Sequence, residues 1–102
     1  IILANLPNLK AINLQSIEAI GDLALCQLPN CEITYPSNLI AYYRSSNNKL
    51  YDFESNPRRK VYFTVSQDVL DKESTKNFVQ TYSAHLQNDN STYSEYNPVN
   101  WN

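Results

Sequence analysis

A short stretch near the start of the chain is written out a second time 22 residues later. Residues 3–9 read LANLPNL and residues 25–31 read LCQLPNC, with Leu, Leu, Pro and Asn at matching positions. The same offset relates Ile17 to Leu39 and Ile20 to Tyr42, beyond the copied words. Residues 50–53 (LYDF) repeat the apolar spacing more weakly after another 22 residues. A constant offset of this size predicts structural units that stack on one another.

The apolar positions inside each period indicate what one unit contains. Leu9, Ile12 and Leu14 alternate with polar residues as a half-buried strand does, and this Leu-x-x-Ile-x-Leu spacing is the leucine-rich-repeat signal. In the second copy the strand is one residue shorter and the following bend one residue longer, which preserves the period. Such compensation indicates a constrained coil length, because each coil buries its apolar edge only against its neighbours.

The second half of the chain departs from this pattern. The third coil loosens from Arg44 onward, and residues 61–65 (VYFTV) alternate as the last strand of the stack would. Residues 66–70 form a capped turn, and a helix from about 74 to 86 carries Phe78, Tyr82 and Leu86 on one stripe. The sequence therefore predicts an α+β fold, a short right-handed leucine-rich-repeat solenoid of about three coils with strands on one face and a C-terminal covering helix. Its parts are coils and terminal strand at 1–70, a helical cap at 71–87 and a polar tail at 88–102.

Charge and composition exclude several classes of partner. Lys and Arg number 8 against 10 Asp and Glu, a net charge of −2, so no polybasic surface exists for nucleic acid. The longest apolar run is far short of the ~20 residues that a membrane-spanning helix needs. Fourteen Asn against one Gly indicate that Asn supplies the sharp turns. Because the chain opens at Ile1 without Met or an approach segment, we interpret it as a piece of a longer protein.

Side chains that could carry chemistry are few and scattered. Cys26 and Cys31 fall at small and inward positions of the repeat, which favours free structural thiols over a disulfide or a zinc site. His85 is the single histidine and has no evident catalytic partner, although a small hydrolase stays a distant alternative. The acidic group Asp68, Asp71 and Glu73 suits a helix start better than calcium. We expect no enzyme activity, no catalytic or metal-binding residue and no cofactor.

Residues 9–28 resemble the BspA-type leucine-rich repeat. Ile20-Gly21-Asp22-Leu23-Ala24-Leu25 matches that family's Ile-Gly-Asp and Ala-Phe words with Leu25 in place of Phe, and residues 35–39 (YPSNL) resemble its strand end and bend. Leu28 stands where the family usually has Cys, and Tyr42 replaces its second Ile without a following Gly-Asp. The resemblance implies a bacterial-type or protist surface or secreted protein that binds host proteins, matrix proteins or other cells.

Two functions follow from these expectations. The first is a non-catalytic recognition or adhesion module, extracellular or at the cell surface, whose outward residues contact a protein partner. The predicted contact residues are Lys10, Asn13, Glu32, Thr34, Arg58, Arg59, Tyr62 and Thr64. The alternative is a structural C-terminal cap of a longer repeat protein, which self-associates as a homo-oligomer through the open N-terminal edge before Leu3.

Overall fold

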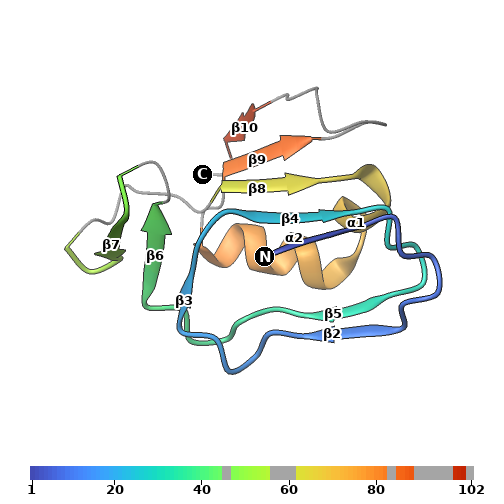
Figure 1. The fold of residues 1–102 in the computed structure, drawn as a ribbon, viewed down its shortest axis with the longest axis horizontal. Coiled ribbons are helices and arrows are strands. Elements are labelled where there is room, and N and C mark those ends of the chain that lie inside the picture. The colour runs from blue at the N-terminus through green and yellow to red at the C-terminus, as the bar shows by residue number, and fades with distance from the viewer. Residues whose placement is uncertain (45–46, 56–61, 83–84, 89–97, 101–102) are drawn as a thin grey trace.

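The computed structural model describes residues 1–44, 47–55, 62–82, 85–88 and 98–100. Twelve elements make up an α+β fold (Figure 1). In chain order they are β1 (Ile2–Ala4), β2 (Ala11–Asn13), β3 (Ala19–Ile20), β4 (Leu23–Cys26), β5 (Glu32–Thr34), β6 (Ala41–Arg44), β7 (Lys49–Asp52), β8 (Tyr62–Val65), α1 (Gln67–Leu70), α2 (Glu73–Tyr82), β9 (His85–Asn88) and β10 (Pro98–Asn100).

Two consecutive segments of the chain follow the same course and lie side by side. The first circuit, residues 1–20, contains β1, β2 and β3, and the second circuit, residues 23–44, contains β4, β5 and β6. Each strand pairs in parallel with its counterpart, at Leu3↔Leu25, Ile12↔Ile33 and Ile20↔Tyr42. These offsets are 22, 21 and 22 residues, so the predicted shortening of the strand and lengthening of the bend are confirmed.

The strands lie in three sheets, whereas the sequence predicts that they lie on one face. One sheet has the order β1-β4-β8-β9-β10, a second pairs β2 with β5, and a third has the order β3-β6-β7. The chain bends sharply after β1 and after β4, where Asn5 and Gln27 both have φ of 55°. Asn30 Nδ2 donates to the Pro7 carbonyl at 2.9 Å, which ties the two bends together. Residues 23–25 are part of strand β4.

The expected third coil is wrong. Strand β7 returns antiparallel to β6 as a hairpin, with Tyr42 opposite Tyr51 and Tyr43 opposite Leu50. The Tyr42 and Tyr51 rings stack with their centroids 5.2 Å apart, whereas the Leu50 side chain is 61% exposed. Asn48 takes a φ of 58° just before β7, a left-handed turn conformation that asparagine tolerates.

The C-terminal part of the chain also differs from the prediction. Strand β8 is not the last strand, because it lies between β4 and β9 and pairs in parallel with both. Helix α2 ends at Tyr82, and the predicted helical residues His85 and Leu86 belong to β9. The expected polar tail contributes β10, which pairs antiparallel with β9. Val61 lies outside the described residues.

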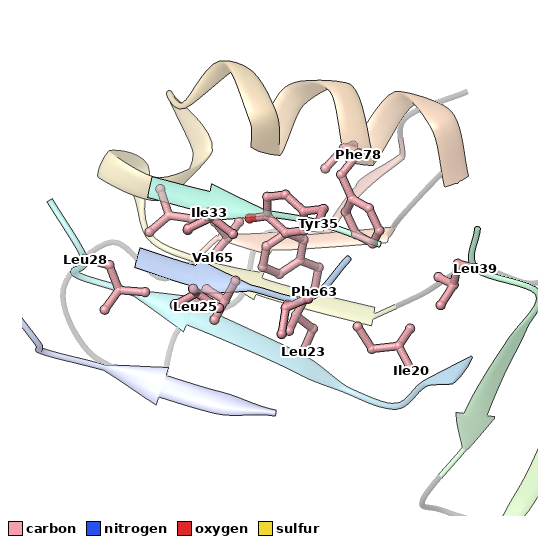
Figure 2. Close-up of a cluster of buried hydrophobic side chains, with 14 of the residues drawn as sticks. Ile20, Leu23, Leu25, Leu28, Ile33, Tyr35, Leu39, Phe63, Val65 and Phe78 are labelled. Carbon is pink, nitrogen blue, oxygen red and sulfur yellow. The ribbon is translucent and has the colours of Figure 1, made fainter. Parts of the chain in front are cut away.

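The hydrophobic core lies between the two circuits, β8 and the helices (Figure 2). Leu25, Phe63 and Val65 are completely buried, as are Val69 of α1 and Val79 of α2. Burial of each such side chain contributes about 1.5–3 kcal/mol, so this cluster supplies much of the driving force for folding. The turn predicted at 66–70 is confirmed as α1. Ser66 holds its N-cap position, but the Ser66 side chain makes no capping hydrogen bond.

Helix α2 packs beside the second circuit, as a covering helix should. The Phe78 ring stacks on the Tyr35 ring at 4.6 Å and meets the Phe63 ring edge-on at 6.2 Å. Figure 1 shows α2 between the five-stranded sheet and β5. Phe78 and Val79 are buried, and Phe78 is a member of the predicted apolar stripe.

Candidate protein-binding surfaces

Four of the predicted contact residues come together on the β2–β5 pair. Asn13 and Thr34 are register partners, and the Glu32 amide donates to the Lys10 carbonyl at 2.9 Å. Lys10, Asn13 and Glu32 are exposed and Thr34 is half-buried. The Asn13 Oδ1 atom accepts from the Gln15 amide at 2.9 Å, which closes the bend after β2.

The other predicted contact residues are not brought to this surface. Tyr62 and Thr64 belong to β8 in the five-stranded sheet, because the chain turns between β4 and β5 and so separates the two sheets. Thr64 is half-buried, and its carbonyl accepts from the Cys26 thiol at 3.7 Å. Arg58 and Arg59 lie outside the described residues.

A groove of about 810 Å³ runs between β5 and α2. Residues 31–37 form one wall along the whole strand, and Glu32 and Thr34 are among them. The other wall consists of Lys72, which directly precedes α2, and the α2 residues Glu73, Ser74, Asn77, Phe78 and Thr81. Its volume falls in the range of about 300–1,000 Å³ that is typical of ligand sites.

The groove wall combines neutral buried groups with charged side chains. Burial raises the pKa of the Cys31 thiol, and the nearby Lys72 ammonium partly opposes that shift. Burial also raises the pKa of Tyr35, although its hydrogen bond to Thr75 works the other way. Both groups are therefore neutral at pH 7. Lys72 reaches toward the Pro29 carbonyl at 3.5 Å, and Glu32 and Glu73 add two exposed carboxylates.

The helical wall of this groove was not predicted from the sequence. Lys72, Asn77 and Thr81 flank the buried Phe78 on one side of α2, a spacing that marks a partly covered helix face. That signal was present in the sequence. The spacing of residues within α2 does not show which strand this helix face packs against, because that depends on how the two circuits fold.

A second surface is the outer edge of the first circuit. Among the exposed large hydrophobic side chains, Ile1 is 43%, Ile2 77% and Leu6 39% exposed. Within the described residues, β1 has a strand neighbour on one side only, since the sheet order begins β1-β4. Exposed apolar side chains along an unpaired strand edge favour association.

The acidic residues near α2 are used within the protein. Asp68 Oδ2 accepts from the Leu28 amide at 2.9 Å, and Asp71 Oδ1 accepts from Gln67 Nε2 at 2.7 Å. No group of three His, Cys, Asp or Glu residues suited to a metal ion occurs within the described ranges. Cys26 and Cys31 are buried free thiols, as predicted. His85, expected on the helix, belongs to strand β9.

Comparisons with known proteins add no relative. No protein-family model, no curated protein and no solved structure matches this chain. In the part of the chain that the structure describes, neither helix has the length and apolar character needed to span a bilayer.

Proposed function

We propose that this protein is a non-catalytic protein-recognition or adhesion module that contacts its partner through the groove between β5 and α2. The observation that carries this proposal is the groove itself, which joins a strand rim and a helix face. Its lining combines buried, uncharged groups such as Tyr35 and Phe78 with the charged residues Glu32, Lys72 and Glu73. Protein interfaces combine an apolar centre with a polar rim in this way.

The proposal extends to the protein's class and location. The 22-residue offset and the parallel pairing of the two circuits support a solenoid of stacked coils. The right-handed BspA-type leucine-rich-repeat class rests on the sequence pattern and its resemblance. The extracellular or cell-surface location rests on the sequence resemblance alone.

A binding assay with two groove variants tests recognition. The protein would be measured against a panel of immobilised extracellular-matrix proteins, namely collagen, fibronectin and laminin. Thr34→Arg and Asn77→Arg place a bulky charge on opposite groove walls, whereas Asn8→Arg makes the same type of change at an exposed bend. Binding that both groove variants abolish and Asn8→Arg preserves supports the proposal. Equal binding by all variants, or no binding to any panel member, overturns it.

A second candidate function is a structural cap that ends a stack of coils. It is favoured by the hydrogen bonds at the end of β4, where side-chain oxygens accept in place of backbone carbonyls. In the first circuit, the Asn5 and Leu6 amides donate to the Cys26 and Gln27 carbonyls of the second circuit. The equivalent amides of the second circuit are those of Gln27 and Leu28. They donate to Ser66 Oγ at 2.7 Å and Asp68 Oδ2 at 2.9 Å.

Ser66 and Asp68 thus stand where the carbonyls of a further coil would be. Their side chains satisfy the amides that a third coil would otherwise have to satisfy, and α1 begins at the same place. The opposite edge, at β1, carries no such side-chain cap within the described residues. A cap closed at one end and open at the other would associate through its open edge.

A further inference from the structure

Within the described residues, the edge of β5 that faces away from β2 lacks the neighbour that the other strands of the second circuit have. On that side β4 pairs with β8 and β6 pairs with β7, whereas the sheet that contains β5 ends there. Helix α2 lies on this side of β5 and β2 on the other, with the groove between strand and helix (Figure 2). The groove therefore follows the position at which a third strand would pair with β5.

Two residues direct their backbone groups from β5 toward this groove. The Glu32 amide donates to the Lys10 carbonyl at 2.9 Å, so Glu32 faces β2. Because alternate residues of a parallel ladder turn both backbone groups to the same side, Thr34 also faces β2, while Ile33 and Tyr35 face α2. Ile33 lines the groove although its side chain is buried in the core, so it offers the groove its N–H and C=O groups.

The dimensions of the groove suit a single extended chain. Residues 31–37 span about 20 Å when extended, so a volume of about 810 Å³ corresponds to a mean cross-section of about 40 Å². An α-helix, about 10–12 Å across with its side chains, would need roughly twice that area. Ile33 is only 2% exposed, which places its backbone at the base of the groove, where the edge of another folded sheet does not reach.

The strand and the helix are joined beneath the groove. The hydroxyl oxygens of Tyr35 and Thr75 are 2.9 Å apart, and the Tyr35 and Phe78 rings stack with their centroids 4.6 Å apart. Moving α2 aside to admit a folded domain would break both of these buried contacts. An extended segment can enter without that loss.

The charges of the lining favour a basic segment. Glu32 and Glu73 supply two carboxylates against the single ammonium of Lys72, and the whole chain has a net charge of −2. Glu32 and Glu73 are exposed, so a cation of the partner can approach them from solvent. Complementary charge of this kind steers a partner and selects it against acidic competitors.

We propose that the groove binds one extended segment of a partner protein, carrying at least one lysine or arginine, which adds to the free edge of β5 as a strand. This inference rests on the proposed recognition through the groove and names the kind of partner. The backbone of the segment pairs with Ile33 and Tyr35, and its basic side chain meets Glu32 or Glu73. Strand addition takes its affinity from main-chain hydrogen bonds and its specificity from side chains.

Peptides selected on the protein from a phage-displayed library of random nonapeptides provide the probe. We expect lysine and arginine to be enriched among them. Thr34→Arg should reduce their affinity about tenfold or more, because it places a bulky cation in the groove. Glu32→Gln should also weaken binding, whereas Glu18→Gln is the matched control, since Glu18 is exposed and does not line the groove.

Amide hydrogen exchange with a selected synthetic peptide identifies the mode of binding. The bound peptide should slow exchange at Ile33 and Tyr35 by about tenfold or more, because their amides gain acceptors. Exchange at Glu32 and Thr34 should stay unchanged, since their amides face β2 in the free protein. N-methylation of alternate peptide residues should weaken binding when it falls on the residues that pair with β5 and not when it falls on those between them.

The possible outcomes separate this inference from the proposed function. Binding that Thr34→Arg abolishes, without slower exchange at Ile33 and Tyr35, overturns strand addition while recognition through the groove stands. If no selected peptide binds through the groove, the inference is wrong, and the matrix-protein panel decides recognition by itself. Equal binding to wild type and Glu32→Gln, with no enrichment of basic residues, overturns the assignment of a basic segment.

Discussion

The hydroxyl oxygens of Tyr35 and Thr75 lie 2.9 Å apart inside the protein. Tyr35 directly follows β5, and Thr75 lies in the first turn of α2, so the bond joins the two walls of the groove. Tyr35 is 8% exposed and Thr75 is fully buried. The Tyr35 ring also stacks on Phe78, which means that one tyrosine sets the position of the strand against the helix through two different contacts.

Replacing Thr75 with valine should destabilise the protein by about 1–3 kcal/mol, because the Tyr35 hydroxyl is left buried without its partner. Urea denaturation would measure the change. The double variant Thr75→Val/Tyr35→Phe should recover most of the loss, since both polar groups are then absent. Thr81→Val is the control: Thr81 is exposed on the same helix, and we expect its change to stay within about 0.5 kcal/mol.

The free energy of unfolding should fall at alkaline pH. Burial raises the pKa of Cys31 and of Tyr35 in the folded state, whereas the unfolded chain ionises them near their ordinary values of about 8.5 and 10. Protons bound more tightly by the folded state stabilise it below these values, and this stabilisation is lost as pH rises above them.

Denaturation measured at a series of pH values separates the two groups. Cys31→Ala should remove the decline that begins above about pH 8.5, and Tyr35→Phe the part that begins above about pH 10. A wild-type profile that stays flat through both ranges would contradict the assignment.

Ser66→Ala should cost about 1–3 kcal/mol, because the Gln27 amide then loses its acceptor at the end of β4. Amide hydrogen exchange gives a local readout, in which protection should fall at Gln27. Asp68→Ala should do the same at Leu28. Asp71→Ala serves as the control, because Asp71 is exposed and its carboxylate accepts from the Gln67 side chain.

Gln27→Gly should stabilise the protein by up to about 1 kcal/mol. Gln27 has a φ of 55°, a left-handed conformation that costs a residue with a Cβ roughly 1–2 kcal/mol and glycine almost nothing. Thermal denaturation would measure the gain. Gln15→Gly, at a position without positive φ, should instead lower the melting temperature. A lower melting temperature for Gln27→Gly would contradict the argument from backbone strain.

The first half of the fold was predictable because its pairing is written in the sequence. Ile17 and Leu39, or Ile20 and Tyr42, keep their offset since each residue occupies the same position in successive circuits. The one-residue compensation at Ile33 could also be read directly. Parallel stacking of like residues thus left a periodic record.

In the second half of the chain, the sequence carries no periodic offset that matches the strand pairing. Leu50 and Phe53 preserve the spacing of a third coil, but an antiparallel hairpin places Tyr51 on Tyr42 instead. Leu86 continues the helical period of Phe78, yet β9 takes it because β8 offers an unpaired edge. Short apolar runs suit a helix or a strand equally, and only the neighbouring strand decides.

The candidate binding surface was predictable on the β2–β5 pair but not at the groove between β5 and α2. Outward positions of the first two strands, such as Asn13 and Thr34, follow from alternation, and the structure places them side by side. The groove requires α2 to approach β5, a contact between residues about forty positions apart. Nothing local to either segment specifies it.

The acceptors that close the second circuit arrive late in synthesis. Gln27 and Leu28 bond side chains 39 and 40 residues further along the chain, and β4 must also wait for β8 to cover its other side. Both circuits therefore emerge from the ribosome before the residues that complete them do. Distant pairings of this kind slow folding, so the central strand should become protected only after the chain has been made through Asp68.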